Sequence, residues 1–321
     1  MKINILSSIS LDYCESYLRK IIKFSKLKFI INSRKKILNN IQYVDVYISG
    51  VKIKIDKEFL KKATNLKIIL SPSTGTDHMD LKEIKKKKIK LIHIAKEYKL
   101  LNQFTATSEI VFGLFLSLNR KIILSNKSVI SGYWPREKFI GNQLYGKTFG
   151  ILGLGRLGKI SAKIAKGFQM NVIAHDIKKI KTRNVKMVSL EKLFRLSDVL
   201  SIHTHLTPLT TGMINKKLLK LMKKNSTLIN TSRGKIINES DLLNTLKNKK
   251  IAGAALDIID GEWLNRKELL NHKLIKYSKD NDNLLIVPHI GGTTYESIKG
   301  AREHICKVII NHYENFFFKQ K

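Results

Sequence analysis

The sequence predicts an α/β fold built from parallel sheets in two domains. Apolar runs with the length of strands alternate with segments of helical periodicity almost from end to end, which is typical of parallel α/β proteins. These runs are nearly continuous, as in strands that helices cover on both faces. The length of 321 residues exceeds that of one common hydrophobic core and therefore favours two domains.

The first hundred residues contain one series of strands and helices. Strands are expected at KINILSS, DVYIS, LKIILS and IKLIHIA, and DKEFLKKA has helical spacing between them. From about Thr105 we expect one long apolar helix, SEIVFGLFLSLNRKIILSNKSVI. An irregular segment follows, in which Trp134, Pro135 and Gly141 interrupt the periodicity.

A second series begins at Lys147. TFGILGLG predicts a strand that enters a glycine turn, RLGKISAKIAKGF a helix and MNVIAHD the next strand. Further strands are expected at DVLSIH, STLINTS, AGAALDI and NLLIVPH, with helices such as INKKLLKLM and ESDLLNTLKN between them. An amphipathic helix from about Tyr295 to Phe318 closes the chain.

Composition restricts the class of partner. Sixty Lys and Arg against 25 Asp and Glu give a net charge of +35, which would suit nucleic acid or an anionic membrane. The lysines are spread through every segment, however, and only Lys85 to Lys88 form a tight run, so nucleic-acid binding is not favoured. No apolar run approaches the roughly 18 residues that span a bilayer, and no secretory signal is apparent. Cys14 and Cys306 have neither metal-ligand spacing nor a disulfide framework around them, so the expected location is the cytoplasm.

A glycine motif opens the second series. Gly153, Gly155 and Gly158 form G-x-G-x-x-G between a predicted strand and a predicted helix. Asp176 ends the next strand, at the distance typical of a dinucleotide-binding Rossmann turn. The bare pattern also fits a structural turn, but its context favours a cofactor site.

The same motif predicts which cofactor binds. The backbone N–H groups of Arg156 and Leu157 would face a pyrophosphate at the positive end of the helix. Asp176 would accept hydrogen bonds from the ribose hydroxyls and repel the 2′-phosphate of NADP, so NAD is the expected cofactor. Lys178 and Lys179 weaken that preference without reversing it.

Three polar residues follow predicted strands of the second series. Arg233 comes after LINTS, Glu262 after ALDIIDG and His289 after LLIVP. A histidine can take the hydroxyl proton of a secondary alcohol, a carboxylate can stabilise its imidazolium, and a guanidinium can bind a substrate carboxylate. Each also has an ordinary alternative: an ion pair in an exposed loop, a solvated acid, or a satisfied histidine at a strand end.

These residues lie within a wider resemblance. The chain resembles the D-isomer-specific 2-hydroxyacid dehydrogenases in a series of segments in family order: STGTDHMDL, TATSEIVFGLFLSLNR, the glycine turn, DVLSIHTHLTPLTTGMIN, LINTSRG, AGAALDIIDGE and PHIGG. The resemblance implies that Arg233 binds substrate, that His289 is the acid/base and that Glu262 is its partner. It also implies two doubly wound domains: a flavodoxin-like substrate domain (residues 1–101 and 290–321) and an inserted Rossmann NAD-binding domain (residues 102–289).

Further site residues follow from the resemblance. It places Thr74 and Gly75 at the amides that hold the substrate carboxylate. It also places a set of side chains around the cofactor: Thr107 near the nicotinamide, Thr231 and Asp257 along its ribose and carboxamide, and His203 over the adenosine. The family implies a homodimer, with the segment around Trp134 in its arm.

The activity expected from the resemblance is NAD-dependent hydride transfer involving a small D-2-hydroxy acid or its 2-keto acid. Substrates of the 3-phosphoglycerate, hydroxypyruvate or glyoxylate type suit it, and phosphite oxidation uses the same three residues. An NAD-sensing protein of the corepressor kind is the alternative from another class, because such proteins also retain these residues.

The chain departs from the family pattern at two positions. His205 stands where a proline is common, which would loosen the adenosine loop. Trp263 stands where a proline usually follows the glutamate, and it would reshape the pocket. His203 and His205 together make a poor metal site because no third ligand is nearby in the sequence, so no metal is expected.

Overall fold

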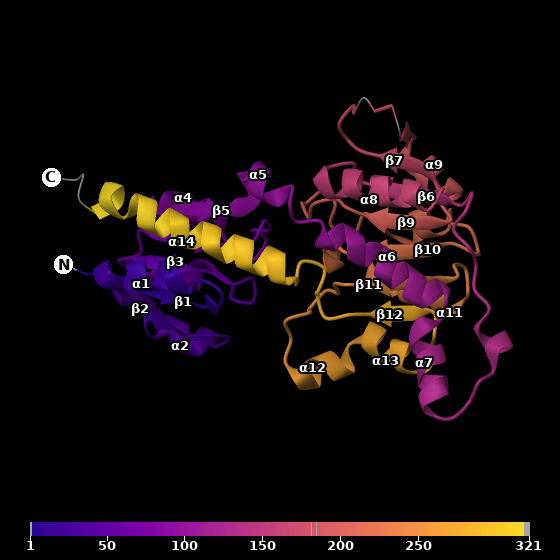
Figure 1. Ribbon diagram of the computed structural model, residues 1–321, viewed down its shortest axis with the longest axis horizontal. Helices are drawn as coiled ribbons and strands as arrows, with labels where there is room; N and C mark the ends of the chain where they lie inside the picture. The colour runs from indigo at the N-terminus through magenta and orange to yellow at the C-terminus, as the bar shows by residue number, and fades with distance from the viewer. Residues whose placement is uncertain (1, 181, 184, 318–321) are drawn as a thin grey trace. The chain divides into compact units, whose positions relative to one another are not determined.

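The computed structural model describes residues 2–180, 182–183 and 185–317 (Figure 1). The chain divides into two compact units. The first contains residues 1–104 and 295–321, and the second contains residues 105–294. The second unit is therefore inserted into the first.

The first unit is built on a parallel sheet of five strands in the order β2-β1-β3-β4-β5. The strands are β1 (Ile3–Ser7), β2 (Ser25–Phe29), β3 (Val46–Ile48), β4 (Ile68–Ser71) and β5 (Lys90–His93). The helices are α1 (Glu15–Phe24), α2 (Arg34–Leu38), α3 (Lys57–Lys62), α4 (Leu81–Lys86), α5 (Tyr98–Leu101) and α14 (Tyr295–Phe317), with 3-10 turns at Ile41–Tyr43 and Ile94–Lys96. This strand order confirms the flavodoxin-like prediction. The expected helix end at Phe318 lies outside the described residues.

Apolar side chains cover both faces of this sheet. Phe59 and Leu60 of α3 belong to the core on one face. On the other face α14 packs beside α1, and Cys306 meets Cys14 in a second core. Both cysteines of this pair, which come from opposite ends of the chain, are buried.

The second unit is built on a parallel sheet of seven strands in the order β12-β11-β10-β9-β6-β7-β8. The strands are β6 (Thr148–Leu152), β7 (Asn171–His175), β8 (Lys186–Met187), β9 (Val199–Ile202), β10 (Thr227–Asn230), β11 (Gly253–Leu256) and β12 (Leu284–Ile286). The helices are α6 (Ala106–Asn119), α7 (Ile122–Ile130), α8 (Arg156–Gly167), α9 (Leu190–Leu196), α10 (Lys216–Leu219), α11 (Glu239–Lys247), α12 (Arg266–Asn271) and α13 (Lys273–Asp280), with 3-10 turns at Arg136–Phe139 and Gly234–Ile236. The first six of these strands in the chain, β6 to β11, have the Rossmann order, as predicted.

Helices cover both faces of this sheet as well. Side chains of α6 and α8 form the core on one face, including Phe115 and Ala165. Side chains of α9, α11 and α13 form the core on the other, including Phe194, Leu246 and Leu274. Both faces of the sheet are therefore shielded from solvent, which explains the unbroken apolar sequences of its strands.

Parts of the structure differ from the sequence-based expectation, and the short strand β8 (Lys186–Met187) is one that was not expected. The long apolar helix is two helices, because Lys121 adopts a left-handed conformation with φ +51° between α6 and α7. Strand β2 was not expected, because its sequence SKLKF carries lysines that lie exposed at the sheet edge. A lysine-bearing edge strand of this kind resists pairing with other chains.

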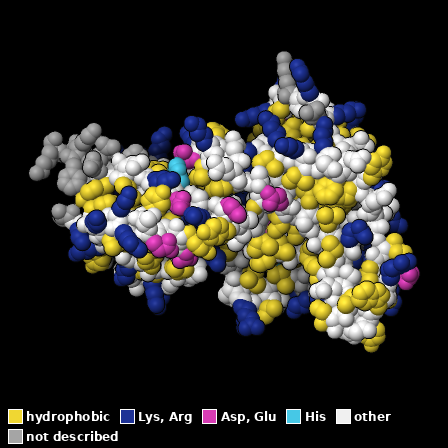
Figure 2. Space-filling view, viewed as in Figure 1, with side chains coloured by type: hydrophobic (Ala, Val, Ile, Leu, Met, Phe, Trp, Pro, Cys, Tyr) yellow, Lys and Arg dark blue, Asp and Glu magenta, His cyan; other side chains and the backbone are white. Residues whose placement is uncertain are grey.

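The surface agrees with the scattered distribution of lysines in the sequence. Lys and Arg side chains are spread over the face that Figure 2 shows, and they do not form one continuous patch there. Among the described residues, no helix combines the length and the apolar character needed to cross a bilayer.

Candidate active site

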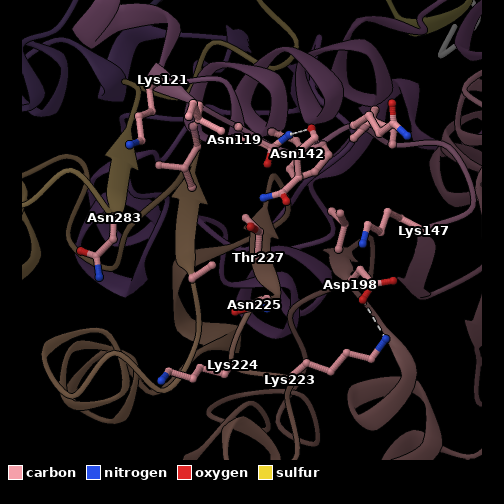
Figure 3. A pocket seen from close by; sticks show the side chains of 18 of the residues that line it. Asn119, Lys121, Asn142, Lys147, Asp198, Lys223, Lys224, Asn225, Thr227 and Asn283 are labelled. Carbon is pink, nitrogen blue, oxygen red and sulfur yellow. Dashed lines mark hydrogen bonds and ion pairs between the residues drawn. The ribbon is translucent and has the colours of Figure 1, made fainter. Parts of the chain in front are cut away.

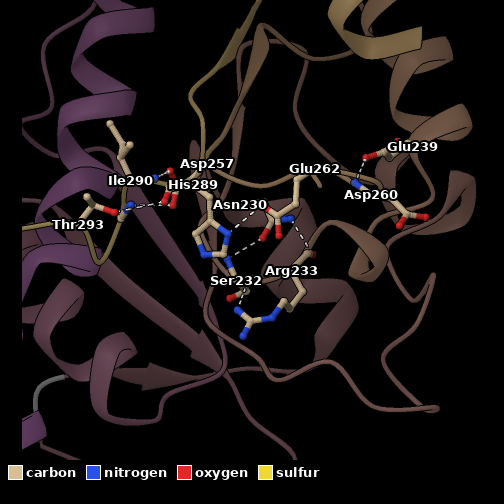
Figure 4. Close-up of polar contacts among 11 residues, drawn as sticks. Asn230, Ser232, Arg233, Glu239, Asp257, Asp260, Glu262, His289, Ile290 and Thr293 are labelled. Atoms are coloured by element: carbon tan, nitrogen blue, oxygen red, sulfur yellow. Dashed lines mark hydrogen bonds and ion pairs between the residues drawn. The ribbon is translucent and has the colours of Figure 1, made fainter. Parts of the chain in front are cut away.

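The three candidate catalytic residues follow neighbouring strands of the second unit. β10, β11 and β12 lie side by side in the sheet, and their carboxyl ends therefore meet at one edge. Arg233 follows β10, Glu262 follows β11 and His289 follows β12 (Figure 4). Ligands of open α/β sheets bind at this edge.

Glu262 and His289 form the central contact of this site. Oε2 of Glu262 lies 2.7 Å from Nδ1 of His289, and the two side chains are 17% and 26% exposed. A carboxylate at Nδ1 fixes the neutral ring with its proton on that nitrogen. Nε2 is then the nitrogen at which the ring can take up or release a proton.

The backbone at His289 is in an unusual conformation. Its φ is +53°, in the left-handed region that non-glycine residues seldom adopt. The N–H of His289 donates to the backbone oxygen of Asp257 at 2.8 Å. The carboxylate of Asp257 accepts from the next two amides, Ile290 N at 2.7 Å and Gly291 N at 2.9 Å. These bonds hold the turn that presents the imidazole.

Asp257 is itself almost fully buried, with 1% of its surface exposed. Burial raises the pKa of its carboxyl group, although the two amides and the nearby His289 act in the opposite direction. The sequence suggested a place beside the cofactor for this residue. The geometry also gives it a part in shaping the His289 turn, and no sequence signal indicated that part.

The loop of Arg233 is tied to its own strand. Nη1 of Arg233 donates to the backbone oxygen of Ser232 at 2.7 Å, and the side-chain amide of Asn230 donates to the backbone oxygen of Arg233 at 2.9 Å. Gly234 lies against the loop that leads to Glu262, because a Cβ at Gly234 would come 2.2 Å from the carbonyl carbon of Ile259. Only glycine fits there, and the two active-site loops are therefore packed together.

Two further residues support the Glu262 loop and were not found from the sequence. Glu239 of α11 accepts from Asp260 N at 2.7 Å. Its other oxygen lies 3.2 Å from Nε2 of His272, and both side chains are nearly buried. Burial raises the pKa of Glu239, against the effects of the Asp260 amide and of His272. A single glutamate after a helix-capping asparagine gives no sequence signal for this contact.

The glycine turn connects β6 to α8. Gly153 has φ +95°, and a Cβ there would come 2.8 Å from the backbone oxygen of His203. A Cβ at Gly158 would come 2.3 Å from the backbone oxygen of Gly153. A Cβ at Gly155 would meet nothing within 4 Å. Gly155 is thus the glycine that leaves backbone open to a ligand, beside the start of α8 at Arg156, whose pKa is lowered by burial.

Asp176 follows β7, next to this turn. Its Oδ2 accepts from Leu154 N at 2.8 Å and its Oδ1 from Lys178 N at 2.9 Å. A cavity of about 880 Å³ adjoins it. The cationic side chains of this cavity are Lys178, Lys179, Lys186, Lys192 and Arg195. The cavity is therefore more basic than the two lysines in the sequence had indicated.

The remaining cofactor candidates lie near the same edge of the sheet. Thr231 directly follows β10, and its buried Oγ1 has no hydrogen-bond partner among the described residues. Thr107 of α6 lies within 4.0 Å of the Cβ position of Gly292, just after the His289 turn. His203 follows β9, with Nε2 2.9 Å from Ser201 Oγ, and burial lowers its pKa to about 4. His203 is therefore neutral near pH 7. The glycine turn and the unpaired Thr231 hydroxyl fit a bound dinucleotide.

Thr74 and Gly75 belong to the first unit, in the loop after β4. In that loop Ser73 Oγ donates to the backbone oxygen of Gly75 at 3.0 Å. These two residues are thus in a different unit from Arg233, Glu262 and His289. His203 and His205 do not gather with other ligands, since the described residues contain no group of three or more His, Cys, Asp or Glu that could hold a metal ion.

A second pocket, of about 470 Å³, opens at the amino ends of β9 and β10 (Figure 3). Its polar side chains include Lys147, Lys224 and an ion pair in which Lys223 Nζ lies 2.7 Å from Asp198 Oδ1. None of the predicted site residues lines this pocket. It lies at the edge of the sheet opposite to the candidate active site.

Two family models match the chain. Residues 3–99 match the catalytic domain, and residues 112–291 the NAD binding domain, of the D-isomer specific 2-hydroxyacid dehydrogenases. A glyoxylate reductase of Thermococcus litoralis is 36% identical over 292 residues, covering 86% of this chain and 83% of the relative. A D-3-phosphoglycerate dehydrogenase of Methanocaldococcus jannaschii is 32% identical over 286 residues, covering 86% of this chain and 52% of the relative.

Solved structures are similar over nearly the whole chain. A D-lactate dehydrogenase from Aquifex aeolicus, in complex with NAD and lactic acid, has a TM-score of 0.85 at 27% identity and covers 99% of this chain and 97% of that one. An acyclic imino acid reductase in complex with NADPH and D-Arg has a TM-score of 0.80 at 26% identity, covering 98% and 97%. The chain belongs to the D-isomer specific 2-hydroxyacid dehydrogenase family and is an oxidoreductase that acts on a CH–OH group with NAD(P).

Proposed function

We propose that this protein uses NADH to reduce a small 2-keto acid to the D-2-hydroxy acid, and catalyses the reverse oxidation with NAD. The observation that carries the proposal is the contact of 2.7 Å between Glu262 and His289 at the carboxyl edge of the NAD-binding sheet. A carboxylate-paired imidazole at this edge is the group that proton transfer to or from a substrate oxygen requires.

The proposed roles follow from the chemistry of each side chain. His289 gives a proton from Nε2 to the keto oxygen in reduction and takes it back in oxidation. Glu262 keeps the ring in the orientation that exposes Nε2 and stabilises its charged form. Arg233 binds the substrate carboxylate. In the first unit, Thr74 and Gly75 are the proposed substrate contacts. The bound nicotinamide supplies the hydride donor or acceptor.

The proposed cofactor is NAD. Gly153, Gly155 and Gly158, with the amides of Arg156 and Leu157, would hold the pyrophosphate at the start of α8. The other proposed cofactor contacts are Thr107, Asp176, His203, Thr231 and Asp257. The carboxylate of Asp176 supports NAD over NADP, because a 2′-phosphate beside it would be repelled. The basic cavity next to Asp176 would attract a 2′-phosphate and therefore limits the preference for NAD.

The proposed substrates are small acids of the glyoxylate and hydroxypyruvate type or 3-phosphohydroxypyruvate. The names of the relatives support both groups, since glyoxylate reductases and D-3-phosphoglycerate dehydrogenases match at similar identity. The residues that distinguish these acids would lie in the substrate domain, for which we propose residues 1–101 and 290–321, with the NAD-binding domain at 102–289.

We further propose a homodimer. Helix α7 has no buried residue, although its sequence IILSNKSVI is mostly apolar. Ile130 is 78% exposed, and Trp134, just after the helix, is 81% exposed. Figure 2 shows hydrophobic side chains at the surface where Figure 1 draws α7. A second copy of the chain would cover this surface.

The decisive experiment follows the absorbance of NADH while purified protein is offered a panel of 2-keto acids. The panel contains glyoxylate, hydroxypyruvate, pyruvate, 3-phosphohydroxypyruvate and larger branched or aromatic acids, with NADPH in a parallel series. A clear preference for one acid with NADH is the expected result. Protein that binds NADH yet turns over no acid would contradict the proposal and favour an NAD sensor, unless phosphite with NAD restores turnover.

A further inference from the structure

The indole ring of Trp263 lies against the imidazole ring of His289. The ring centroids are 5.7 Å apart, and the planes are stacked with an angle of 27° between them. Glu262, the preceding residue, meets the same imidazole at its edge through Nδ1. Two consecutive residues thus contact one ring from two directions, one at the edge and the other on the face.

The loop that carries Trp263 is fixed on both sides. Upstream, Asp260 N donates to the nearly buried Glu239 at 2.7 Å. Downstream, Asn265 and Glu268 form a capping box that starts α12. Trp263 itself is 44% exposed, so burial in the hydrophobic core does not account for its position. Its ring stacks on the imidazole of His289.

We propose that Trp263 is a positioning residue for His289, which rests on the proposed function of His289 as the acid/base. A single hydrogen bond at Nδ1 leaves the imidazole able to tilt about the line to Glu262. Stacking on the indole face removes that freedom and keeps Nε2 in one direction. An indole face also attracts a cation, so the contact favours the protonated ring.

The charged groups around the imidazole set the sign of the expected pH effect. Within this unit the anions that face it are Glu262, at Nδ1, and Asp257, below its backbone turn. Arg233 follows the strand two places away in the sheet. Replacing Trp263 by an apolar residue adds or removes no charge. Loss of the indole should therefore shift the activity of reduction, which needs the protonated ring, towards lower pH.

Tryptophan fluorescence tests the contact directly, without substrate. The chain has two tryptophans, so Trp134→Phe leaves Trp263 as the only indole and Trp263→Phe leaves Trp134. A protonated imidazole quenches an indole that it touches. In the Trp134→Phe protein, fluorescence should therefore rise as the pH is raised and the imidazole loses its proton. The rise should disappear when His289→Asn is added, and it should be absent from the Trp263→Phe protein.

Kinetics separates positioning from a purely structural effect. Trp263→Leu should lower kcat about tenfold, because a misaligned acid slows the chemical step, with little change in KM. Its pH profile for reduction should shift to lower pH. Trp263→Phe, which keeps an aromatic face, should restore most of kcat. Equal thermal unfolding temperatures of the variants would show that the fold is intact.

The results separate the role of Trp263 from the proposed function of the protein. A fluorescence titration that persists in the His289→Asn protein, or full activity in Trp263→Leu with an unshifted pH profile, would overturn the role of Trp263. A His289-dependent titration in a protein that reduces no acid would instead leave the contact in place and contradict the proposed function.

Discussion

Three consecutive backbone amides, from His289 to Gly291, all donate to Asp257. The amide of His289 reaches its backbone oxygen at 2.8 Å, and the next two amides reach its carboxylate at 2.7 and 2.9 Å. This arrangement holds His289 at φ +53°, a conformation that costs energy for a residue with a side chain. The residue at the end of β11 therefore fixes the direction of the imidazole after β12.

Asp257→Asn should disturb this turn. An asparagine offers one acceptor oxygen, and its NH2 group would face the second amide donor in a site with 1% exposure. We expect a loss of about 1–3 kcal/mol in the free energy of unfolding and a fall of at least about tenfold in kcat, measured by denaturant titration and NADH oxidation. Asp260→Asn is the control, because the Asp260 side chain is 50% exposed. Equal effects of Asp257→Asn and Asp260→Asn would contradict the conclusion that the Asp257 carboxylate holds the turn at His289.

The proposed roles of His289 and Arg233 predict different kinetic defects. His289→Ala should lower kcat by about 10²–10⁴-fold, because it removes the acid/base, and NADH affinity should stay near that of the unchanged protein. Arg233→Ala should raise KM for the keto acid and also lower kcat, since a bidentate contact to the carboxylate is lost. Steady-state kinetics and NADH titration by fluorescence would distinguish the two. Preserved turnover in either purified variant would contradict the assigned role.

Gly153 and Gly155 of the turn should have different roles, the first in the stability of the fold and the second in NADH binding. Gly153→Ala should lower the free energy of unfolding by about 1–3 kcal/mol, because its φ is +95° and the new Cβ would come 2.8 Å from His203 O. Gly155→Ala should leave stability almost unchanged, because nothing lies within 4 Å of its Cβ and its φ is −74°.

NADH affinity should respond in the opposite way. In the folded proteins, Gly155→Ala should weaken NADH binding more than Gly153→Ala does. In Gly155→Ala the methyl group would stand between the backbone and the pyrophosphate, so NADH binding should weaken at least about tenfold. Thermal unfolding with and without NADH measures both effects. Unchanged NADH affinity in Gly155→Ala would mean that the pyrophosphate does not approach this backbone.

Asp176 should govern the choice between NADH and NADPH. Asp176→Ser removes the charge that opposes a 2′-phosphate and leaves the nearby lysines and Arg195 in place. The ratio of kcat/KM for NADPH to that for NADH should rise at least about tenfold. Asp198→Asn, at the opposite edge of the sheet, should leave the ratio unchanged. An unaltered ratio in Asp176→Ser would place the discrimination elsewhere.

Asp198 should make the stability of the second unit depend on pH. Burial acts to raise the pKa of its carboxyl group, but hydrogen bonds from Lys223 Nζ and Thr148 N outweigh this and lower the pKa. The ionised form therefore stabilises the fold above the unfolded pKa, and this contribution is lost as the pH falls through the folded pKa.

Asp198→Asn should consequently lower the free energy of unfolding by about 1–2 kcal/mol at pH 7. The difference from the unchanged protein should shrink below about pH 4, where the unfolded carboxyl group is already protonated. Urea unfolding across a series of pH values measures it. A difference that stays constant down to pH 3 would contradict an ionic origin.

Local sequence patterns predicted most elements because parallel strands that are buried on both faces need continuous apolar runs. The glycine turn could also be predicted, because local backbone geometry sets the spacing of its glycines and of the following Asp176. The break at Lys121 was not visible, since a lysine in the left-handed conformation has no local signature. Strand β2 was missed because its pairing with β1 is non-local and its exposed lysines conceal it.

The sequence by itself determined most strands and helices, the family and the identity of the three polar residues at strand ends. Only the tertiary structure decided which of these groups touch. Glu262 meets His289, Trp263 covers the imidazole face, and Asp257 receives three amides because β11 and β12 are adjacent in the sheet. Adjacency of strands depends on packing between distant segments, and no local pattern of residues encodes the distance between two loops.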